Sequence, residues 1–239
     1  MSGIVSILAL VCARGGSKGL PGKNLRLFRG VPLVAHAVQQ AHAARGVTRV
    51  IVSTDCPDIA AAASDAGADV PFLRPAQLAT DTAAEWLVWR HALDHVRAET
   101  GELPAALVVV PPTAPRRIPA DITQAIDAFR EGGSDVVLTV TAAHRNPWFN
   151  MVTLDADGRA QLVNVPSVPF SRRQDVPVVH DLTTVAYVAD PKFVLTQSGL
   201  FAGRVRAVQV PPERAIDIDT LLDLQLAESL DTLEAAACR

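Results

Sequence analysis

The sequence predicts an α/β fold that is doubly wound, with a mostly parallel sheet and helices on both faces. Apolar runs alternate with helical patterns through the first two-thirds of the chain. Runs that are apolar at every position are typical of parallel strands whose two faces are both covered. A loop rich in glycine and proline follows the first apolar run, where such folds turn from their first strand toward their first helix.

The predicted strands are segments in which apolar residues follow one another without a helical period. They cover residues 5–13, 49–53, 70–73, 105–110, 136–140, 182–188 and 205–210. Most are separated by helical patterns, as expected for repeated strand–helix units.

The predicted helices carry apolar residues three and four positions apart. They cover residues 32–44, 57–66, 83–100, 119–131, a segment that begins at 191, and 220–236. Trp86, Trp89 and Leu93 show this spacing within one of them. Gly67 and Gly132 follow two others, as expected where a helix ends.

Residues 142–179 interrupt the alternation of strands and helices. This segment lacks a helical period and contains Asn146-Pro147 and Asp157-Gly158, which are typical of turns. Residues 151–154 and 160–163 flank the second turn and predict a β-hairpin. We interpret residues 1–239 as a single domain with an insertion at about 142–179 that projects from the sheet.

Charge and cysteine content exclude several classes of partner and location. The formal net charge is −3 without any run of like charges, so we predict neither a nucleic-acid partner nor a membrane partner. Residues 4–13 are too few to span a bilayer, and no Lys or Arg precedes them as in a signal peptide. Cys12, Cys56 and Cys238 lack metal-ligand spacing, so we predict reduced thiols in a cytoplasmic protein.

The loop after the first predicted strand, residues 13–24, has the composition of a phosphate cradle. Its glycines let backbone N–H groups approach a polyphosphate, and Arg14, Lys18 and Lys23 supply positive charge. The chain has 19 arginines and three lysines, and two of those lysines lie in this loop. The loop is not a Walker loop, because Ser17 stands at the first glycine position and Asn24 follows Lys23. A purely structural turn is the alternative.

Two carboxylates, Asp217 and Asp219, stand at i and i+2 between the last predicted strand and the last predicted helix. Side chains at this spacing can direct oxygen atoms at one hard cation. Mg²⁺ is typically held by one or two carboxylates together with substrate phosphates. The alternative is that Asp219 caps the final helix, because Asp is a favoured residue at helix N-termini.

Six motifs in register resemble those of the acylneuraminate cytidylyltransferases, which make CMP-activated nonulosonic acids. They are the loop over 13–24 and the segments 53–55, 74–82, 112–116, 173–177 and 216–220. The resemblance therefore extends over almost the whole chain. It implies a single nucleotidyltransferase domain, CTP and a small acidic sugar as substrates, and a homodimer in which the insertion reaches the partner's active site.

The resemblance also implies roles for individual residues. The catalytic residues would be Arg14, Lys18, Lys23 and Asp217. The nucleotide-binding residues would be Arg14, Gly15, Gly16, Ser17, Lys18, Lys23, Asn24 and Arg74. The acceptor-binding residues would be Arg173, Gln174 and Tyr187, and the Mg²⁺ ligands would be Asp217 and Asp219.

The implied reaction is attack of the anomeric hydroxyl of the sugar on the α-phosphorus of CTP, with release of pyrophosphate. Such chemistry depends mostly on positioning and on charge neutralisation by cations and metal. Asp217 is a candidate acceptor for the hydroxyl proton. Arg173 suits the sugar carboxylate, which a guanidinium can bind through two hydrogen bonds. A solvated surface charge is the alternative for Arg173.

Several positions depart from the family pattern at the acceptor end. Pro111 and Thr183 stand where the sialic-acid enzymes have amide side chains, and residues 144–150 contain no lysine. Glu85 replaces a small polar residue near the nucleotide. The activity class survives these departures, but N-acetylneuraminate as the acceptor does not follow. An octulosonate-type acceptor and a non-catalytic CTP-binding regulator remain as alternatives.

Overall fold

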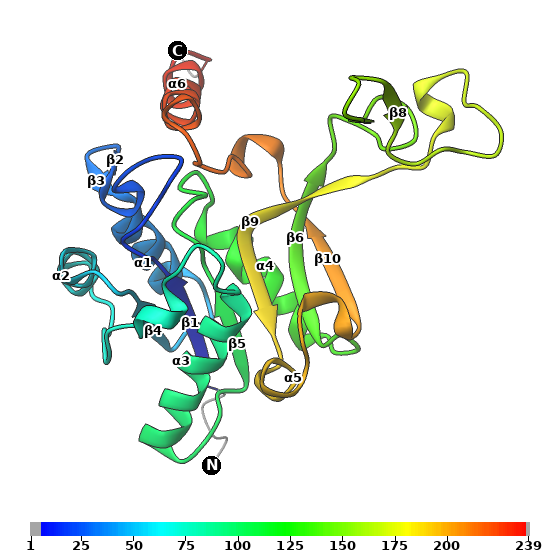
Figure 1. The fold of residues 1–239 in the computed structure, drawn as a ribbon. Coiled ribbons are helices and arrows are strands. Elements are labelled where there is room, and N and C mark those ends of the chain that lie inside the picture. Colours follow the sequence, from blue (N-terminus) through cyan, green and yellow to red (C-terminus); the bar gives the residue numbers. More distant parts are fainter. Residues whose placement is uncertain (1–5, 238–239) are drawn as a thin grey trace.

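The computed structural model describes residues 6–237, with side chains described through residue 230. Its centre is a six-stranded sheet in the order β10-β6-β9-β5-β1-β4 (Figure 1). The strands are β1 (Ile7–Cys12), β4 (Arg49–Ser53), β5 (Ala106–Val109), β6 (Val136–Ala142), β9 (His180–Ala189) and β10 (Val205–Gln209).

The predicted mostly parallel sheet is confirmed, with one strand that runs against the rest. β1 pairs in parallel with β4 and β5, and β6 pairs in parallel with β10. β9 lies between β5 and β6 and is antiparallel to both. The amino-terminal end of β9 therefore lies at the edge of the sheet where its two neighbouring strands end.

The predicted strand over residues 70–73 is not formed, so that prediction was wrong. The segment forms two isolated bridges, Ile51 with Asp69 and Thr54 with Leu73, instead of a continuous ladder. Pro71 lies between the bridges and has no backbone N–H to donate, so a regular strand cannot pass through it.

A short hairpin was missed at the sequence level. It pairs β2 (Leu27–Phe28) with β3 (Val31–Pro32). Arg29 and Gly30 both have positive φ, 52° and 77°, as a tight two-residue hairpin turn requires.

Residues 6–237 form six α-helices. They are α1 (Leu33–Ala43), α2 (Pro57–Asp65), α3 (Glu85–Thr100), α4 (Pro119–Arg130), α5 (Pro191–Thr196) and α6 (Leu221–Ala237). Short 3₁₀ turns cover Lys23–Leu25, Ala76–Leu78, Arg173–Asp175, Leu200–Ala202 and Pro212–Arg214. Within the described residues, none of these helices combines the length and the apolar character needed to cross a membrane.

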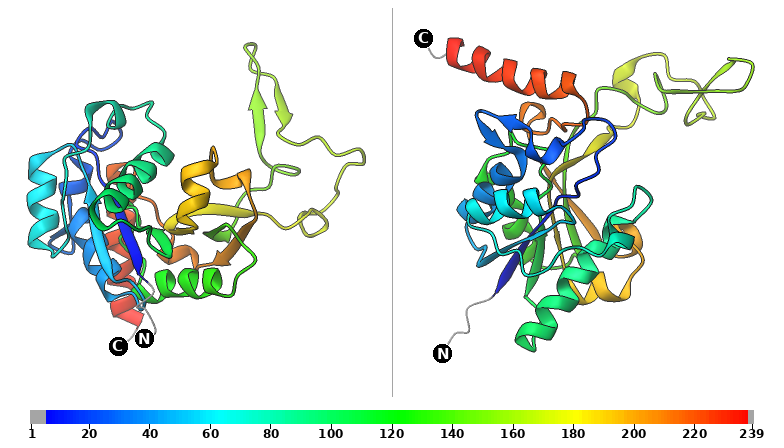
Figure 2. Two further views of the ribbon diagram at one scale, coloured as in Figure 1. Left: turned by 90° about the horizontal axis from the view of Figure 1, so that it is seen from below. Right: turned by 60° about the vertical axis from the view of Figure 1, so that its left-hand side comes forward.

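The two faces of the sheet bury separate cores, as the alternation of side chains along a strand requires. Ala9 and Val11 of β1 pack on the side of α1, α2 and α4. Leu8 and Leu10 pack on the opposite side, against α3 and α5. Figures 1 and 2 show these helices on both sides of the sheet. This arrangement explains why the central strands are apolar at every position.

The segment between β6 and β9 extends away from the sheet, as Figures 1 and 2 show. It contains the predicted hairpin, β7 (Val152–Leu154) paired with β8 (Ala160–Leu162). Its two ends meet, because Ala142 of β6 and His180 of β9 are register partners. Val165, Val168 and Val178 in and beside it are 76%, 73% and 85% exposed.

The N-terminus of α4 depends on a buried carboxylate, that of Asp121, which is 1% exposed. It accepts a hydrogen bond from the backbone N–H of Ile118 at 3.0 Å and pairs with the Arg214 guanidinium at 3.0 Å. One side chain therefore caps the helix and anchors the segment that leads to Asp217.

We predict that Asp121→Asn lowers the free energy of unfolding by about 3 kcal/mol, because it leaves Arg214 without its charged partner. The control is Asp127→Asn, whose carboxylate is exposed and pairs with Arg45. That change should cost less than about 1 kcal/mol. Denaturant unfolding of both variants checks the difference, and equal losses would contradict it.

Candidate active site

A cavity of about 540 Å³ opens at the edge of the sheet where β1 and β5 end. Three segments form most of its wall: the loop after β1, the segment between β4 and α3, and the segment after β5. Thr184 and Tyr187 of β9 and Asp219 before α6 complete it. Segments far apart in the sequence therefore converge on one space.

The loop after β1 is held in a closed curve by hydrogen bonds at its base. The Asn24 side chain, 6% exposed, donates to the Arg14 carbonyl oxygen at 2.8 Å. The Gly15 N–H donates to Asp55 Oδ1 at 2.8 Å. Asn24 thus joins the two ends of the loop as well as lining the cavity.

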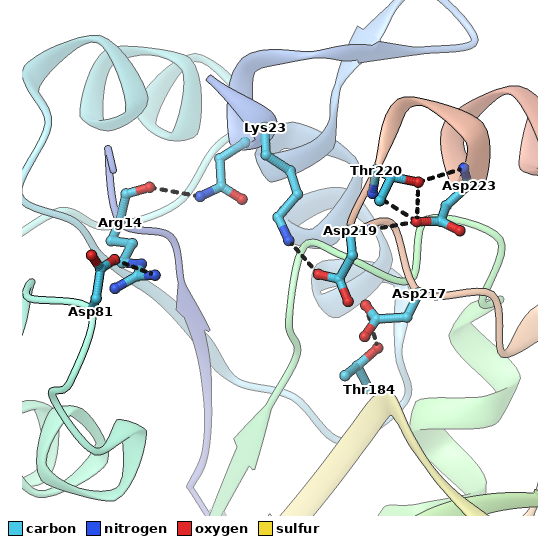
Figure 3. A network of polar contacts seen from close by, with 9 residues as sticks. Arg14, Lys23, Asp81, Thr184, Asp217, Asp219, Thr220 and Asp223 are labelled. Atoms are coloured by element: carbon cyan, nitrogen blue, oxygen red, sulfur yellow. Dashed lines mark hydrogen bonds and ion pairs between the residues drawn. The ribbon is translucent and has the colours of Figure 1, made fainter. Parts of the chain in front are cut away.

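Carboxylates already neutralise the cations of this loop. Asp81 lies 3.0 Å from the Arg14 guanidinium and 2.6 Å from the Lys18 ammonium. Asp219 Oδ1 lies 2.9 Å from Lys23 Nζ. Figure 3 shows this ion pair. The hydrogen bond from Lys18 is the largest cause that lowers the pKa of Asp81. Arg14, Lys18 and Lys23 therefore each have a carboxylate partner.

Gly19 lies where the loop touches the segment of Asp219. A Cβ atom at Gly19 would lie 2.6 Å from the Asp219 carbonyl oxygen, too close for any side chain. At Gly16, by contrast, a Cβ atom would meet nothing within 4 Å. Close approach, not backbone conformation, requires glycine at position 19.

The two predicted metal ligands have different partners. Asp217 Oδ1 accepts a hydrogen bond from the Thr184 hydroxyl at 3.1 Å, whereas Asp219 pairs with Lys23 (Figure 3). The described residues contain no group of three His, Cys, Asp or Glu side chains that could hold a metal ion. Two carboxylates fit a Mg²⁺ ion that takes its other ligands from phosphates and water.

The alternative role of Asp219 as a helix cap is not observed. The Asp223 carboxylate accepts from the Thr220 N–H at 2.7 Å, and the Thr220 hydroxyl accepts from the Asp223 N–H at 3.3 Å. This reciprocal pair caps α6. The Asp219 side chain therefore does not cap the helix and pairs with Lys23 instead.

The floor of the cavity lies on the α3 side of the sheet. Burial raises the pKa of the Cys12 thiol well above its usual value, and Glu85 adds to the effect. Burial also raises the pKa of Tyr187 to about 12. Both groups are therefore neutral at physiological pH and lie in the same cavity as the Glu85 carboxylate, which adds to both shifts.

Arg74 is buried beside this floor. Its guanidinium donates to Ser53 Oγ at 3.0 Å and to the Ser53 carbonyl oxygen. The motif over residues 53–55 and the one that begins at Arg74 thus form one hydrogen-bonded unit at the end of β4. Arg74 lines the cavity, as expected of a nucleotide contact.

The structure gathers most of the predicted site residues but not all of them. Those that line the cavity are Arg14, Ser17, Lys18, Lys23, Asn24, Arg74, Tyr187 and Asp219. Gly15, Gly16 and Asp217 lie beside it, next in sequence or hydrogen-bonded to residues that line it. Arg173 and Gln174 instead line a second cavity in the insertion, where Arg173 donates to the His144 carbonyl oxygen at 2.8 Å.

Sequence reasoning missed three residues that line the cavity. Asp81, Thr184 and Gly19 were not singled out, although Asp81 and Gly19 lie within matched motifs and Thr184 follows Thr183 directly. Thr183, expected at the acceptor position, is 5% exposed and donates to Thr139 at 2.7 Å. Its neighbour Thr184 lines the cavity instead. The pairing of β6 with β9 shifts register in this region, where the Thr183 side chain is buried and the Thr184 side chain faces the cavity.

A parallel-rich sheet, a cationic loop after its first strand and a facing carboxylate pair define a nucleotide-binding transferase. A family model described as Cytidylyltransferase matches residues 8–236, and the chain belongs to this family. It is a CTP-dependent nucleotidyltransferase.

Relatives of known designation resemble the chain over nearly its full length. Post-translational flagellin modification protein B of Campylobacter coli is 34% identical, with 94% of each chain covered. CMP-N,N′-diacetyllegionaminic acid synthase of Campylobacter jejuni is 31% identical, with 97% of each covered. The solved structure of CMP:2-keto-3-deoxy-manno-octonic acid synthetase with CTP has a TM-score of 0.70 at 18% identity, covering 96% of this chain and 99% of that one. The last comparison shows the shared fold.

We predict that Gly19→Ala lowers kcat/KM for CTP by about ten- to a hundredfold, because the loop and Asp219 must move apart. Gly16→Ala adds the same methyl group without a clash and should cause a much smaller loss. Steady-state kinetics with CTP varied, alongside melting temperatures, measure both. Equal effects would show that the contact with Asp219 is not required.

Proposed function

We propose that this enzyme transfers CMP from CTP to the anomeric hydroxyl of a nonulosonic acid and releases pyrophosphate. The observation that carries the proposal is the cavity lined by Arg14, Lys18 and Lys23, in which Lys23 pairs with Asp219 and the other two cations pair with Asp81. Cations placed around a polyphosphate neutralise the charge that develops on the leaving group. The relatives named for CMP-activated sugar acids support this acceptor class.

The phosphates would take over the cations that Asp81 and Asp219 now hold. Arg14, Lys18 and Lys23 would bind phosphate oxygens, with the backbone of Gly15 and Gly16 and the Ser17 hydroxyl as further donors. Lys23 would thereby release Asp219. Asn24 and Arg74 would contact the nucleoside from the base of the loop and the end of β4.

We further propose Mg²⁺ as the cofactor, held by Asp217 and Asp219 together with oxygen atoms of the nucleotide. Bound there, the ion would supply positive charge at the reacting phosphate. Asp217 is also our candidate for accepting the proton of the attacking hydroxyl. Tyr187, kept neutral by burial, can donate a hydrogen bond to the acceptor.

The acceptor site would be completed by a second copy of the chain. Arg173 and Gln174 line a cavity of the insertion rather than the nucleotide cavity. The insertion also exposes apolar side chains, as a surface covered in a dimer would. We therefore propose a homodimer in which the insertion of one protomer brings Arg173 to the acceptor bound by its partner.

We also propose that residues 1–239 act as one nucleotidyltransferase domain in the cytoplasm. Cys12, at the end of β1, and Cys56, just before α2, are both free thiols. Unpaired thiols suit a reducing compartment.

We predict that N-acetylneuraminate is a poorer acceptor than another nonulosonic acid of the panel. Pro111 lines the cavity and stands where the resemblance implies an amide, and one lost hydrogen bond costs about 1–3 kcal/mol, roughly five- to 160-fold in kcat/KM. Pyrophosphate release from CTP with N-acetylneuraminate, N,N′-diacetyllegionaminate and a 3-deoxy-octulosonate measures the order.

The panel also separates the alternative functions. A best rate with the octulosonate would replace our acceptor class, and no release with any acid despite CTP binding would favour a regulator. If N-acetylneuraminate is best by a wide margin, the interpretation of Pro111 is wrong.

We predict that Asp217→Asn and Asp219→Asn each lower turnover about a hundredfold or more, because the charge that holds the metal is lost. Asp94→Asn, which removes an exposed carboxylate paired with Arg97 on α3, is the control and should keep its turnover. Pyrophosphate release at saturating CTP, with circular dichroism to check folding, measures the effect. Near-normal turnover in both site variants would rule out the metal assignment.

A further inference from the structure

We infer that Thr184 is a positioning residue that fixes the orientation of the Asp217 carboxylate for metal binding. The inference rests on the proposed function, because it assumes that Asp217 binds the metal. It extends that proposal to a residue of β9 that lies outside the site roles implied by the resemblance.

The contact is direct and specific. Thr184 Oγ1 donates to Asp217 Oδ1 at 3.1 Å, across 33 positions of sequence (Figure 3). The other oxygen, Oδ2, accepts no hydrogen bond from the described residues. One oxygen of the carboxylate is therefore held while the other is available to a cation.

The backbone that carries this hydroxyl is itself fixed. The Arg117 guanidinium, 1% exposed, donates to the Val185 carbonyl oxygen at 2.7 Å and the Thr184 carbonyl oxygen at 3.4 Å. It also donates to the Pro111 carbonyl oxygen, so β9 is tied to the segment after β5. Because Arg117 holds the backbone of Thr184 in place, the Thr184 hydroxyl can fix the orientation of the Asp217 carboxylate.

The two proposed metal ligands, Asp217 and Asp219, differ in what must change before each can bind a cation. Asp219 pairs with Lys23, a contact that incoming phosphates would replace. The partner of Asp217 is the neutral hydroxyl of Thr184, so no ion pair has to break before Asp217 binds a cation. Groups that hydrogen-bond to metal ligands commonly change metal affinity or activity by about ten- to a hundredfold when they are removed. Thr184 therefore acts through Asp217 rather than on the reacting atoms.

The adjacent threonine offers a matched control. Thr183 has the same side chain, but its hydroxyl donates to Thr139 at 2.7 Å inside the protein. Loss of that hydroxyl removes a buried hydrogen bond without touching Asp217. A valine at either position keeps the shape of the side chain and deletes the hydroxyl alone.

The experiment measures the Mg²⁺ concentration that gives half of the rise in melting temperature at saturating CTP, without acceptor. We expect Thr184→Val to raise this concentration about tenfold and to lower kcat by a similar factor. Thr184→Ser, which keeps the hydroxyl, should restore both to within about threefold. Thr183→Val should lower the melting temperature in the absence of ligands and leave the Mg²⁺ midpoint unchanged.

An unchanged Mg²⁺ midpoint in Thr184→Val would overturn the inference. So would a rise in KM for the acceptor with the midpoint unchanged, since Thr184 would then contact the sugar. Asp217→Asn is measured in parallel to separate the two levels of the argument. If Asp217→Asn shifts the midpoint and Thr184→Val does not, only the inference fails. If Asp217→Asn does not shift it either, the metal assignment fails as well.

Discussion

The buried guanidinium of Arg117 is the interaction on which the shape of the site depends. It joins α1, through Gln40, to the segment after β5 and to β9. Burial lowers its pKa to about 9, and the nearby carboxylates of Asp217 and Asp121 oppose that effect, so the group is still charged at neutral pH. Each carbonyl oxygen that lost this donor would be buried without a partner, at a cost of about 1–3 kcal/mol. The backbone around Pro111 and Thr184 is rigid for this reason.

The remaining parts of the cavity, around the backbone that Arg117 holds, are arranged by pairs of opposite charges. The segment with Asp217 and Asp219 is attached to this backbone, because the Ile218 N–H donates to the Thr113 carbonyl oxygen at 2.7 Å. Opposite, the loop after β1 presents its cations, closed at its base by Asn24 and pressed against Asp219 at Gly19. The cations and carboxylates hold one another across the space that the substrate would fill. The resting site is therefore ordered without a ligand and close to electrically balanced.

The sequence predicted those parts of the molecule that follow from local patterns. The sheet, most of its helices and the cationic loop follow from apolar periodicity and glycine placement. The loop cations, Asn24, Arg74, Tyr187 and Asp219 do line one cavity. Pairing partners did not follow: nothing local indicates that Asp81 binds Arg14 and Lys18, or that Thr184 rather than Thr183 faces the cavity. Those outcomes depend on how distant strands align, and one register shift reverses which side chain points inward. Pro71 shows the opposite case, in which a local rule should have prevented the prediction of a strand.

Because Ala142 pairs with His180, the segment between β6 and β9 is a loop whose two ends lie side by side on the sheet. The chain leaves β6 and enters β9 at paired residues. The intervening segment therefore closes on the sheet in the same way as a hairpin loop. The entropic cost of lengthening such a loop grows only slowly, by about 0.6 kcal/mol for each doubling of its length. The length of this segment can therefore vary at small cost to the sheet that carries the nucleotide cavity.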